Sequence, residues 1–506
     1  MRALVIGDSD SYVKWGAAVL DRMPGDWQRD MVVIGSRAVP STEQLEAALA
    51  GSSLRREMVP IVDLGDVTDY VRRNRPDVVL MSVRGQVVRV LVRAIVAASA
   101  EAGMDRPVFV TGLPGISIPA TGKALYFRSQ ADYFLLHSKR EIREFTALAE
   151  KMGVQQSFGL ATLPFLVTLP SHAASTVTLP LQAPSLVSSG EQGAGARAAA
   201  ASSSGPIVFA AQAKVPRERE DRLHVLRALV DTARAFPDRR VVIKVRARRG
   251  ETQTHAELHP YDDLLEDAEL LAAVGELPPN LVVEGGPMGD HLAVASGLVT
   301  VSSTAAIEAV AAGVPVITLD DFGESTELIN LVFSGSGLPG SSTDLRAGKF
   351  RMPEAAWLDD NYFHPTEDND WVAGIVELAR RRELGLLPLR EQFRGRLGGS
   401  MRRAWDRKLA LGDYDHTRSA AAAYAVGVPL RAFVNFARTP IRAFRRRRNR
   451  RAREAALASA VSGGSSANSV SSASSASSAS SVSSVSPVST VSSDPSVVGN
   501  GEGMSS

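Results

Sequence analysis

A hydroxyl-rich loop between a predicted strand and a predicted helix is the clearest candidate for chemistry in this sequence. Ser302, Ser303 and Thr304 follow the apolar run 298–301, and an alanine-rich helix is predicted over 305–312. Ligands of open α/β sheets bind at the carboxyl ends of strands, and the free N–H groups that begin a helix favour a phosphate. The loop therefore predicts a phosphate-binding site.

Glu308 lies one turn into the same predicted helix, so its carboxylate could point back at the same ligand. Ser303 or Thr304 could instead simply cap the helix. A capping box needs a glutamate three residues after the cap, whereas Glu308 is four residues after Thr304. Capping alone therefore does not explain Glu308, and on pattern alone both interpretations stay open.

A second set of polar residues follows the first predicted strand, 2–7. Asp8 and Asp10 lie in a loop without GxGxxG, so the dinucleotide-binding fingerprint is missing. An attacking hydroxyl must lose a proton, which makes each carboxylate a candidate general base. The alternative is that Asp8 caps the following helix and Asp10 is solvated.

His137 ends the predicted strand 133–137 and is a third candidate for acid–base chemistry. We expect it to face the presumed cleft from the carboxyl end of its strand, where it could move a proton, although a structural histidine is the commoner outcome. Ser138, with Glu141 three residues later, matches a capping box and predicts that the next helix begins there.

Cationic and amide side chains follow the strands of the second half. Lys244 lies within the predicted strand 240–245, where a lysine must face an edge, a cleft or a partner. Arg246 and His255 lie in the loop after it, and Gln212 follows the preceding strand. Such groups suit a nucleotide phosphate, while a solvated basic loop is the alternative.

The alternation of short apolar runs with helical segments predicts an α/β fold with two doubly wound parallel sheets, in residues 1–168 and 206–340. Residues 169–205, rich in Ala, Ser, Pro and Gly, form a predicted flexible linker. An acidic turn at 320–327 and a helix over 327–333 are predicted after the second sheet. Residues 341–426 are expected to form helices that pack back on the domains, among them helices over 371–382 and 389–411. A basic amphipathic segment, 427–458, and a disordered Ser/Ala-rich tail, 459–506, are predicted to follow.

Composition restricts the chemistry. The absence of cysteine excludes disulfides, thiolate nucleophiles and cysteine-ligated metals, and no spacing typical of a metal site occurs. No run of about 18 apolar residues is present, so no transmembrane helix is expected. The whole chain carries a net charge of only +2. Chain-wide attraction to nucleic acid is therefore not expected.

Positive charge is concentrated in residues 427–456, which contain ten Arg and one Glu. Phe433, Phe436 and Phe444 alternate with these arginines at helical spacing. Such basic amphipathic segments lie on anionic membrane surfaces. Nucleic-acid binding is the less favoured alternative, and a solvated basic tail explains the pattern without any partner.

The stretch 302–320, SSTAAIEAVAAGVPVITLD, resembles the donor-domain signature of GT-B glycosyltransferases. In many such enzymes the glutamate contacts the donor ribose and the hydroxyl loop contacts the donor phosphate, which implies these roles for Glu308 and for 302–304. Many retaining members carry a second glutamate eight positions earlier, where this chain has Thr300. The chain in this respect resembles the sialyl-, Kdo- and capsule-type transferases, and more widely an actinobacterial glycosyltransferase family.

The resemblance implies two Rossmann-like domains facing a cleft, with the acceptor on the first and the donor on the second. The loop that contains Gly286 and Met288 is expected to face the base or ribose. The expected reaction moves a sugar from a nucleotide-sugar to a cell-envelope or capsular glycan, or to a lipid-linked acceptor, without a metal or other cofactor. A cytoplasmic protein at the inner face of the membrane is expected. The alternatives are a nucleotide-sugar epimerase of related fold and a non-catalytic nucleotide-sugar-binding protein.

Overall fold

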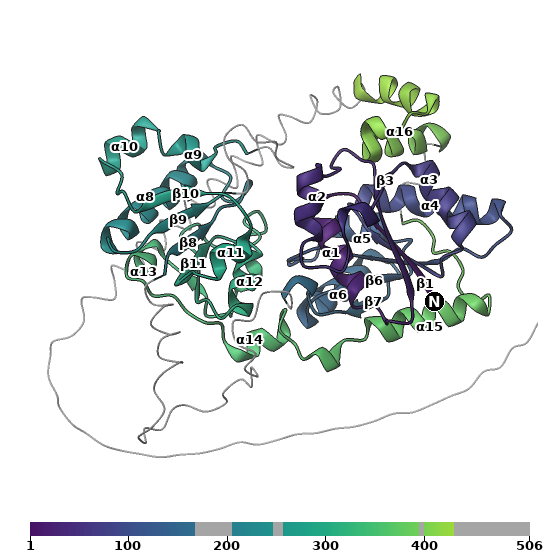
Figure 1. The fold of residues 1–506 in the computed structure, drawn as a ribbon, viewed down its shortest axis with the longest axis horizontal. Helices are drawn as coiled ribbons and strands as arrows, with labels where there is room; N and C mark the ends of the chain where they lie inside the picture. Colours follow the sequence, from purple (N-terminus) through teal and green to yellow (C-terminus); the bar gives the residue numbers. More distant parts are fainter. Residues whose placement is uncertain (167–204, 246–256, 394–398, 430–506) are drawn as a thin grey trace, which may run out of the picture. The chain divides into compact units, whose positions relative to one another are not determined.

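The computed structural model describes residues 1–166, 205–245, 257–393 and 399–429 (Figure 1). The predicted linker lies almost wholly outside these residues, as do the predicted tail and the basic segment from residue 430 onward. Arg246 and His255 also lie outside them. In the described part of the chain, no helix combines the length and the apolar character that a membrane crossing requires.

The first domain is a seven-stranded parallel sheet in the order β3-β2-β1-β4-β5-β6-β7. Its strands are β1 (Arg2–Gly7), β2 (Gln28–Ile34), β3 (Ile61–Val62), β4 (Val78–Ser82), β5 (Val108–Gly112), β6 (Tyr133–Leu136) and β7 (Phe158–Leu160). Its helices are α1 (Asp10–Asp21), α2 (Thr42–Leu49), α3 (Leu64–Asn74), α4 (Gly85–Glu101), α5 (Gly122–Arg128) and α6 (Lys139–Met152). The central strands are apolar runs buried on both faces, as parallel sheets covered by helices require.

The second domain is a six-stranded parallel sheet in the order β10-β9-β8-β11-β12-β13. Its strands are β8 (Ile207–Ala210), β9 (Val241–Lys244), β10 (Leu281–Glu284), β11 (Gly297–Thr300), β12 (Val316–Leu319) and β13 (Pro339–Gly340). Its helices are α8 (Arg219–Ala235), α9 (Tyr261–Leu264), α10 (Ala268–Val274), α11 (Met288–Leu292), α12 (Ala305–Ala311) and α13 (Ser342–Arg346). The predicted fold class, two doubly wound parallel sheets, is confirmed.

Each sheet has a topological switch point, where the strand order reverses direction. In the first sheet it lies between β1 and β4, and in the second between β8 and β11. The loops after these strand pairs diverge to opposite faces of the sheet, which leaves a crevice at the carboxyl ends where ligands of such sheets bind. The switch points therefore locate the regions in which to look for a site.

After the second sheet the chain returns to the first domain through α14 (Ala355–Asp360), α15 (Trp371–Glu383) and α16 (Gly399–Leu411). The green ribbon of α15 runs along the first sheet in Figure 1, where Trp371 and Ile375 join the apolar core of that domain. Helix α16 packs on α4. Residues 389–393, predicted as helix, are not helical, and there Arg390 donates to the Asp132 carbonyl instead.

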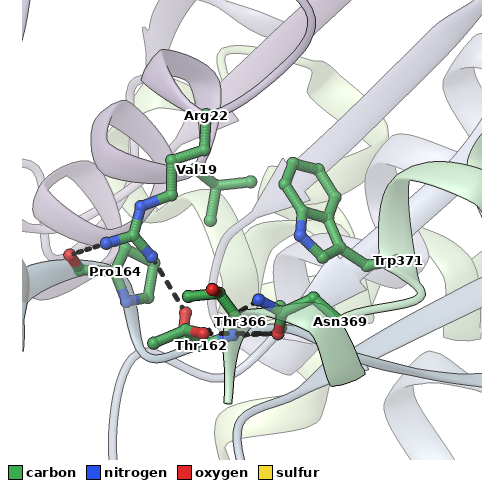
Figure 2. A pocket seen from close by; sticks show the side chains of 8 residues that line it. Val19, Arg22, Thr162, Pro164, Thr366, Asn369 and Trp371 are labelled. Atoms are coloured by element: carbon green, nitrogen blue, oxygen red, sulfur yellow. Dashed lines mark hydrogen bonds between the residues drawn. The ribbon is translucent and has the colours of Figure 1, made fainter. Parts of the chain in front are cut away.

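A small pocket of about 150 Å³ lies where this returning segment meets α1 (Figure 2). Arg22 donates to the carbonyl oxygens of Thr162, at 3.1 Å, and Pro164, at 2.6 Å. The side-chain oxygen of Asn369 accepts from the Thr162 N–H at 2.7 Å. Asn369 thus holds the returning segment on the domain, while Arg22 ties residues 162–164 to α1. No predicted site residue lines the pocket.

The predicted helix 327–333 is wrong. Only a short 3-10 turn, η3 (Leu331–Phe333), forms there. Ile329 has a φ of 56°, a left-handed conformation that an α-helix does not allow. The Asn330 side chain accepts from the Ser325 N–H and donates to the Gly323 carbonyl, so it closes the acidic turn in place of a helix.

Candidate functional site

Asp8 and Arg84 meet at the switch point of the first sheet. Asp8 directly follows β1, and Arg84 is the residue before α4, which follows β4. The fully buried Asp8 carboxylate accepts from the backbone N–H of Arg84 at 3.1 Å and from its Nε at 2.8 Å. Burial raises the pKa of the Asp8 carboxyl, and the charge of Arg84 opposes that rise. Asp8 does not cap α1, because the N-cap position is Ser9, so its contacts make it a positioning residue for Arg84.

Asp10 is the more accessible of the two predicted bases. It is the first residue of α1 and is partly exposed. Among the described residues its carboxylate accepts only a long hydrogen bond, 3.4 Å, from the Ser11 hydroxyl. Lone pairs therefore remain available for a substrate hydroxyl, as a general base requires.

His137 does not face a ligand, contrary to the prediction. Its ring is fully buried against Trp15, whose Nε1 donates to His137 Nε2 at 2.7 Å. Because Nε2 accepts that bond, Nδ1 carries the proton and donates to the Ala161 carbonyl at 2.8 Å. Burial lowers the pKa of His137 to about 4, so the ring is neutral at pH 7. Both nitrogens are occupied, and we do not retain His137 as a catalytic residue.

Glu141 ties the end of β6 to neighbouring segments through three hydrogen bonds. Its carboxylate is buried and accepts from the N–H groups of His137, at 2.8 Å, and Ser117, at 2.9 Å, and from the Tyr362 hydroxyl at 2.7 Å. Burial raises the pKa of the Glu141 carboxyl to about 7. Ser138 caps α6 as predicted, but Glu141 bonds the N–H one residue before the cap and thereby also fixes the backbone of His137.

The neutral, buried His137 makes a contribution to stability that should be lost in mild acid. In the unfolded chain the imidazole gains a proton below its ordinary pKa of 6.5, whereas in the folded chain it does so only near pH 4. At this histidine the unfolded state therefore binds the extra proton between these values, so the His137 contribution to the free energy of unfolding should fall by about 3 kcal/mol over that range. The Glu141 carboxyl, whose pKa is raised to about 7, contributes a change of the opposite sign. Urea unfolding of the natural protein and of a His137 variant, each at pH 7 and pH 4.5, separates the two contributions.

The variant His137→Gln isolates the contribution of this histidine. The side-chain oxygen of the glutamine can still accept a hydrogen bond from Trp15. Glu141 is present in both proteins, so its effect on stability cancels in the comparison. We expect the variant to be less stable than the natural protein at pH 7 and to lose most of that deficit at pH 4.5. Parallel stability curves for the two proteins would contradict the assignment.

Gln212 and Ser302 meet at the switch point of the second sheet, where Gln212 follows β8 and Ser302 follows β11. The Gln212 side-chain oxygen accepts from the Ser302 N–H at 3.0 Å. Thr300 donates to the Ala210 carbonyl at 3.1 Å and accepts from the Ser303 N–H at 3.2 Å. The predicted hydroxyl loop is therefore tied into a fixed conformation between the two strands.

The hydroxyl groups of this loop have different roles. Ser303 Oγ accepts from the Ala305 N–H at 3.2 Å, so it serves the start of α12. Thr304 occupies the N-cap position, but its side chain makes no capping hydrogen bond. A Cβ added at Gly115, in the loop after β5, would lie 3.6 Å from the Thr304 side chain. The Thr304 side chain therefore lies beside a loop of the first domain.

Glu308, on α12, lies among charges from both domains. Burial raises the pKa of its carboxyl, and the positive charges of Lys14 and Lys244 oppose that rise. Lys14 belongs to α1, one turn after Asp10, and residues 1–429 form one compact unit. Within the described residues no donor is hydrogen-bonded to the Glu308 carboxylate, which is partly exposed. A carboxylate in this setting is suited to accept hydrogen bonds from ligand hydroxyls.

The remaining predicted donor residues lie on or after β9 and β10, on one side of the switch point. Lys244 ends β9, next to β8, and is 9% exposed. Gly286 is exposed and has a φ of 92°, so the turn after β10 favours glycine there whether or not a ligand is present. Met288 begins α11 and packs partly against the apolar core around α12. Its contacts with that core give Met288 a structural role.

A family model described as "Putative glycosyltransferase (DUF6716)" matches residues 3–378. The chain belongs to this family. The match spans both sheets and includes both switch points and every predicted site residue. No curated protein matches the sequence.

Solved structures with a similar arrangement of chain are distant relatives. The structure of the MnaA protein of S. aureus with UDP shares 11% sequence identity with this chain and has a TM-score of 0.44. The aligned region covers 76% of this chain and 97% of the MnaA chain. The UDP-GlcNAc 2-epimerase of Methanocaldococcus jannaschii is 12% identical, with a TM-score of 0.45, covering 74% and 99%. The UGT89C1 protein of Arabidopsis thaliana with UDP-L-rhamnose is 12% identical, with a TM-score of 0.40, covering 76% and 94%.

Proposed function

We propose that this member of the family transfers a sugar from a nucleotide-sugar to the hydroxyl of a glycan or lipid-linked acceptor of the cell envelope. Family membership supports the class of reaction. The observation that carries the proposal is the position of Glu308, a carboxylate without a hydrogen-bond donor in the described residues, beside Lys14 and Lys244. It provides a polar site supplied by both domains, next to the switch point of the second sheet.

The donor is proposed to bind at that second switch point. The loop 302–304, whose Ser302 and Ser303 N–H groups are bonded to Gln212 and Thr300, presents the Thr304 hydroxyl to the phosphates. Glu308 accepts hydrogen bonds from the ribose hydroxyls. Lys244 supplies positive charge to the phosphates, and Arg246 and His255, outside the described residues, are proposed to extend this charge.

The acceptor is proposed to bind at the first switch point. Asp10 removes the proton of the acceptor hydroxyl, whose oxygen forms a bond to the anomeric carbon of the donor sugar. The bond between that carbon and the nucleotide phosphate breaks, and the phosphate leaves with the electron pair. Positive groups near Lys244 stabilise the charge that develops on the leaving phosphate. The proposed reaction uses no resident metal.

A membrane-linked acceptor fits the basic segment 427–456, most of which lies outside the described residues. We propose that it binds the anionic inner surface of the cytoplasmic membrane, with nucleic acid the less favoured partner. Co-sedimentation of the full chain with vesicles tests this. Binding that does not depend on anionic lipid would oppose it.

The decisive experiment incubates the full-length protein with CMP-, UDP-, GDP- and dTDP-sugars, with and without EDTA. Binding, hydrolysis, epimerisation and transfer to a mixture of envelope glycans are measured separately. Transfer, or slow hydrolysis without an acceptor, supports the proposal. Epimerisation without an acceptor would assign an epimerase instead, and binding without turnover would indicate a non-catalytic nucleotide-sugar-binding protein. Loss of transfer in EDTA would contradict the metal-independent mechanism.

A further inference from the structure

A second arginine lies at the switch point of the first sheet, where sequence patterns gave no signal. Arg128, at the end of α5, donates through Nη2 to the Tyr12 hydroxyl at 2.9 Å. Tyr12 lies in the first turn of α1, two residues after Asp10. Arg84, fixed by Asp8, also donates to the Ser36 hydroxyl at 2.9 Å. Asp8, Tyr12, Arg84 and Arg128, here called the arginine cluster, therefore come from three separate segments of the first domain: the stretch from β1 into α1, the start of α4 and the end of α5.

The arginine cluster carries an excess of positive charge. Asp8 is paired with Arg84, but no described carboxylate forms an ion pair with Arg128. The nearest partners of Arg128 are neutral: the Tyr12 hydroxyl, the Val83 carbonyl and the face of the Phe134 ring, 5.5 Å from the guanidinium carbon. Two guanidinium groups and one carboxylate leave one net positive charge.

That charge is poorly solvated. The Arg128 side chain is 3% exposed, and its buried Nε has no hydrogen-bond partner. An uncompensated buried charge is costly, and a nearby anion would reduce the cost. Arg84 differs, because 37% of its side chain is exposed and can reach a ligand directly. Arg128 therefore supplies charge from within the domain, while Arg84 supplies the accessible hydrogen-bond donors.

The N-terminus of α4 adds further donors. Arg84 is its N-cap residue, and no side chain caps this 17-residue helix. A Cβ added at Gly85 would meet the Phe127 side chain at 2.8 Å, so glycine allows the helix to begin close to α5, which ends at Arg128. The positive end of the helix dipole thus lies on the same side as both guanidinium groups.

We propose that the arginine cluster binds a singly charged oxyanion on the acceptor, either a carboxylate or a phosphodiester. This inference rests on the proposed function, since it takes the first domain as the acceptor domain. One net positive charge matches one negative charge. The planar guanidinium of Arg84 can bind two oxygens of such a group at once. In this assignment Asp8 positions Arg84, and the acceptor is an anionic glycan, not a neutral one.

The test is calorimetric titration of the full-length protein with two matched pairs of compounds at low ionic strength. Glucuronate is compared with glucose for a carboxylate, and glycerophosphoglycerol is compared with glycerol for a phosphodiester. We expect one charged compound to bind at least about tenfold more tightly than its neutral partner, because hydrogen bonds to charged groups are the stronger ones. The pair that shows the preference identifies the chemical class of the acceptor. Equal affinity within both pairs would overturn the proposal.

Two variants test whether the preference for the charged compound depends on the arginine cluster. Arg84→Gln should reduce the ratio of charged to neutral affinity to near one. Arg72→Gln is the matched control: Arg72 is an ion-paired arginine of the same domain with the same side-chain exposure, 37%, but it lies on α3. It should keep the ratio of the natural protein. An unchanged ratio in Arg84→Gln, or an equal loss in both variants, would refute the assignment.

Nucleotide-sugar binding, measured on the same natural protein, separates this inference from the proposed function. Selective anion binding without any nucleotide-sugar binding would remove the proposed function and leave an anion site at the first switch point. Nucleotide-sugar binding and transfer without anion selectivity would uphold the function and reject the arginine cluster as an acceptor site.

Discussion

Asp10→Asn is expected to slow sugar transfer by about 10²- to 10⁴-fold, the usual contribution of a positioned general base. The carboxylate of Asp10 begins α1 at the first switch point and has only one long hydrogen bond among the described residues. Asparagine keeps nearly the same shape but cannot take the proton of the acceptor hydroxyl. Initial rates of transfer at saturating donor and acceptor measure the loss.

Two further variants test whether the loss of transfer is specific to Asp10. Asp69→Asn, on the exposed surface of α3, should leave the rate unchanged. Asp8→Asn removes the partner of Arg84, so we expect it to raise the acceptor KM more than it lowers kcat. Donor affinity should be the same in all three variants. Full turnover in Asp10→Asn would end its assignment as the base, and a loss confined to Asp8→Asn would transfer the role to Asp8.

Glu308→Gln is expected to weaken nucleotide-sugar binding by roughly 10- to 100-fold, the effect of losing hydrogen bonds to a charged group. The Glu308 carboxylate lies beside two lysines and has no described hydrogen-bond donor of its own, so a ligand must supply the donors. Glutamine fits the same space and removes the charge. Calorimetric titration with the nucleotide-sugar that the natural protein binds gives the two dissociation constants.

The same substitution should not harm the fold. A carboxylate that is partly buried without a donor costs desolvation free energy, so Glu308→Gln should unfold at the same temperature as the natural protein or at a higher one. Glu327→Gln, on an exposed turn of the same domain, is the control and should change neither property. Unchanged donor affinity in Glu308→Gln, or a large loss of stability with it, would show that Glu308 has a structural role.

Much of the fold could be predicted from the sequence because its signals are local. Strands buried on both faces appear as short continuous apolar runs, and glycine, proline and hydroxyl residues mark where they end. The loop 302–304 and the acids Asp8 and Asp10 were accordingly placed at strand ends. The helix predicted over 327–333 failed because Asn330 closes a turn there, a contact that helical periodicity does not reveal.

The sequence by itself determined which residues reach the carboxyl edge of each sheet, but only the tertiary structure decided what they do there. Asp8 meets Arg84 across 76 residues, and His137 meets Trp15 across 122. The position of a residue at a strand end follows from the chain itself. The direction and charge state of its side chain depend on neighbours brought by other strands, through burial and hydrogen bonding. For this reason the pattern that made His137 a candidate base could not show that Trp15 and Ala161 occupy both of its nitrogens, nor that Arg128 stands near Asp8 without a carboxylate of its own.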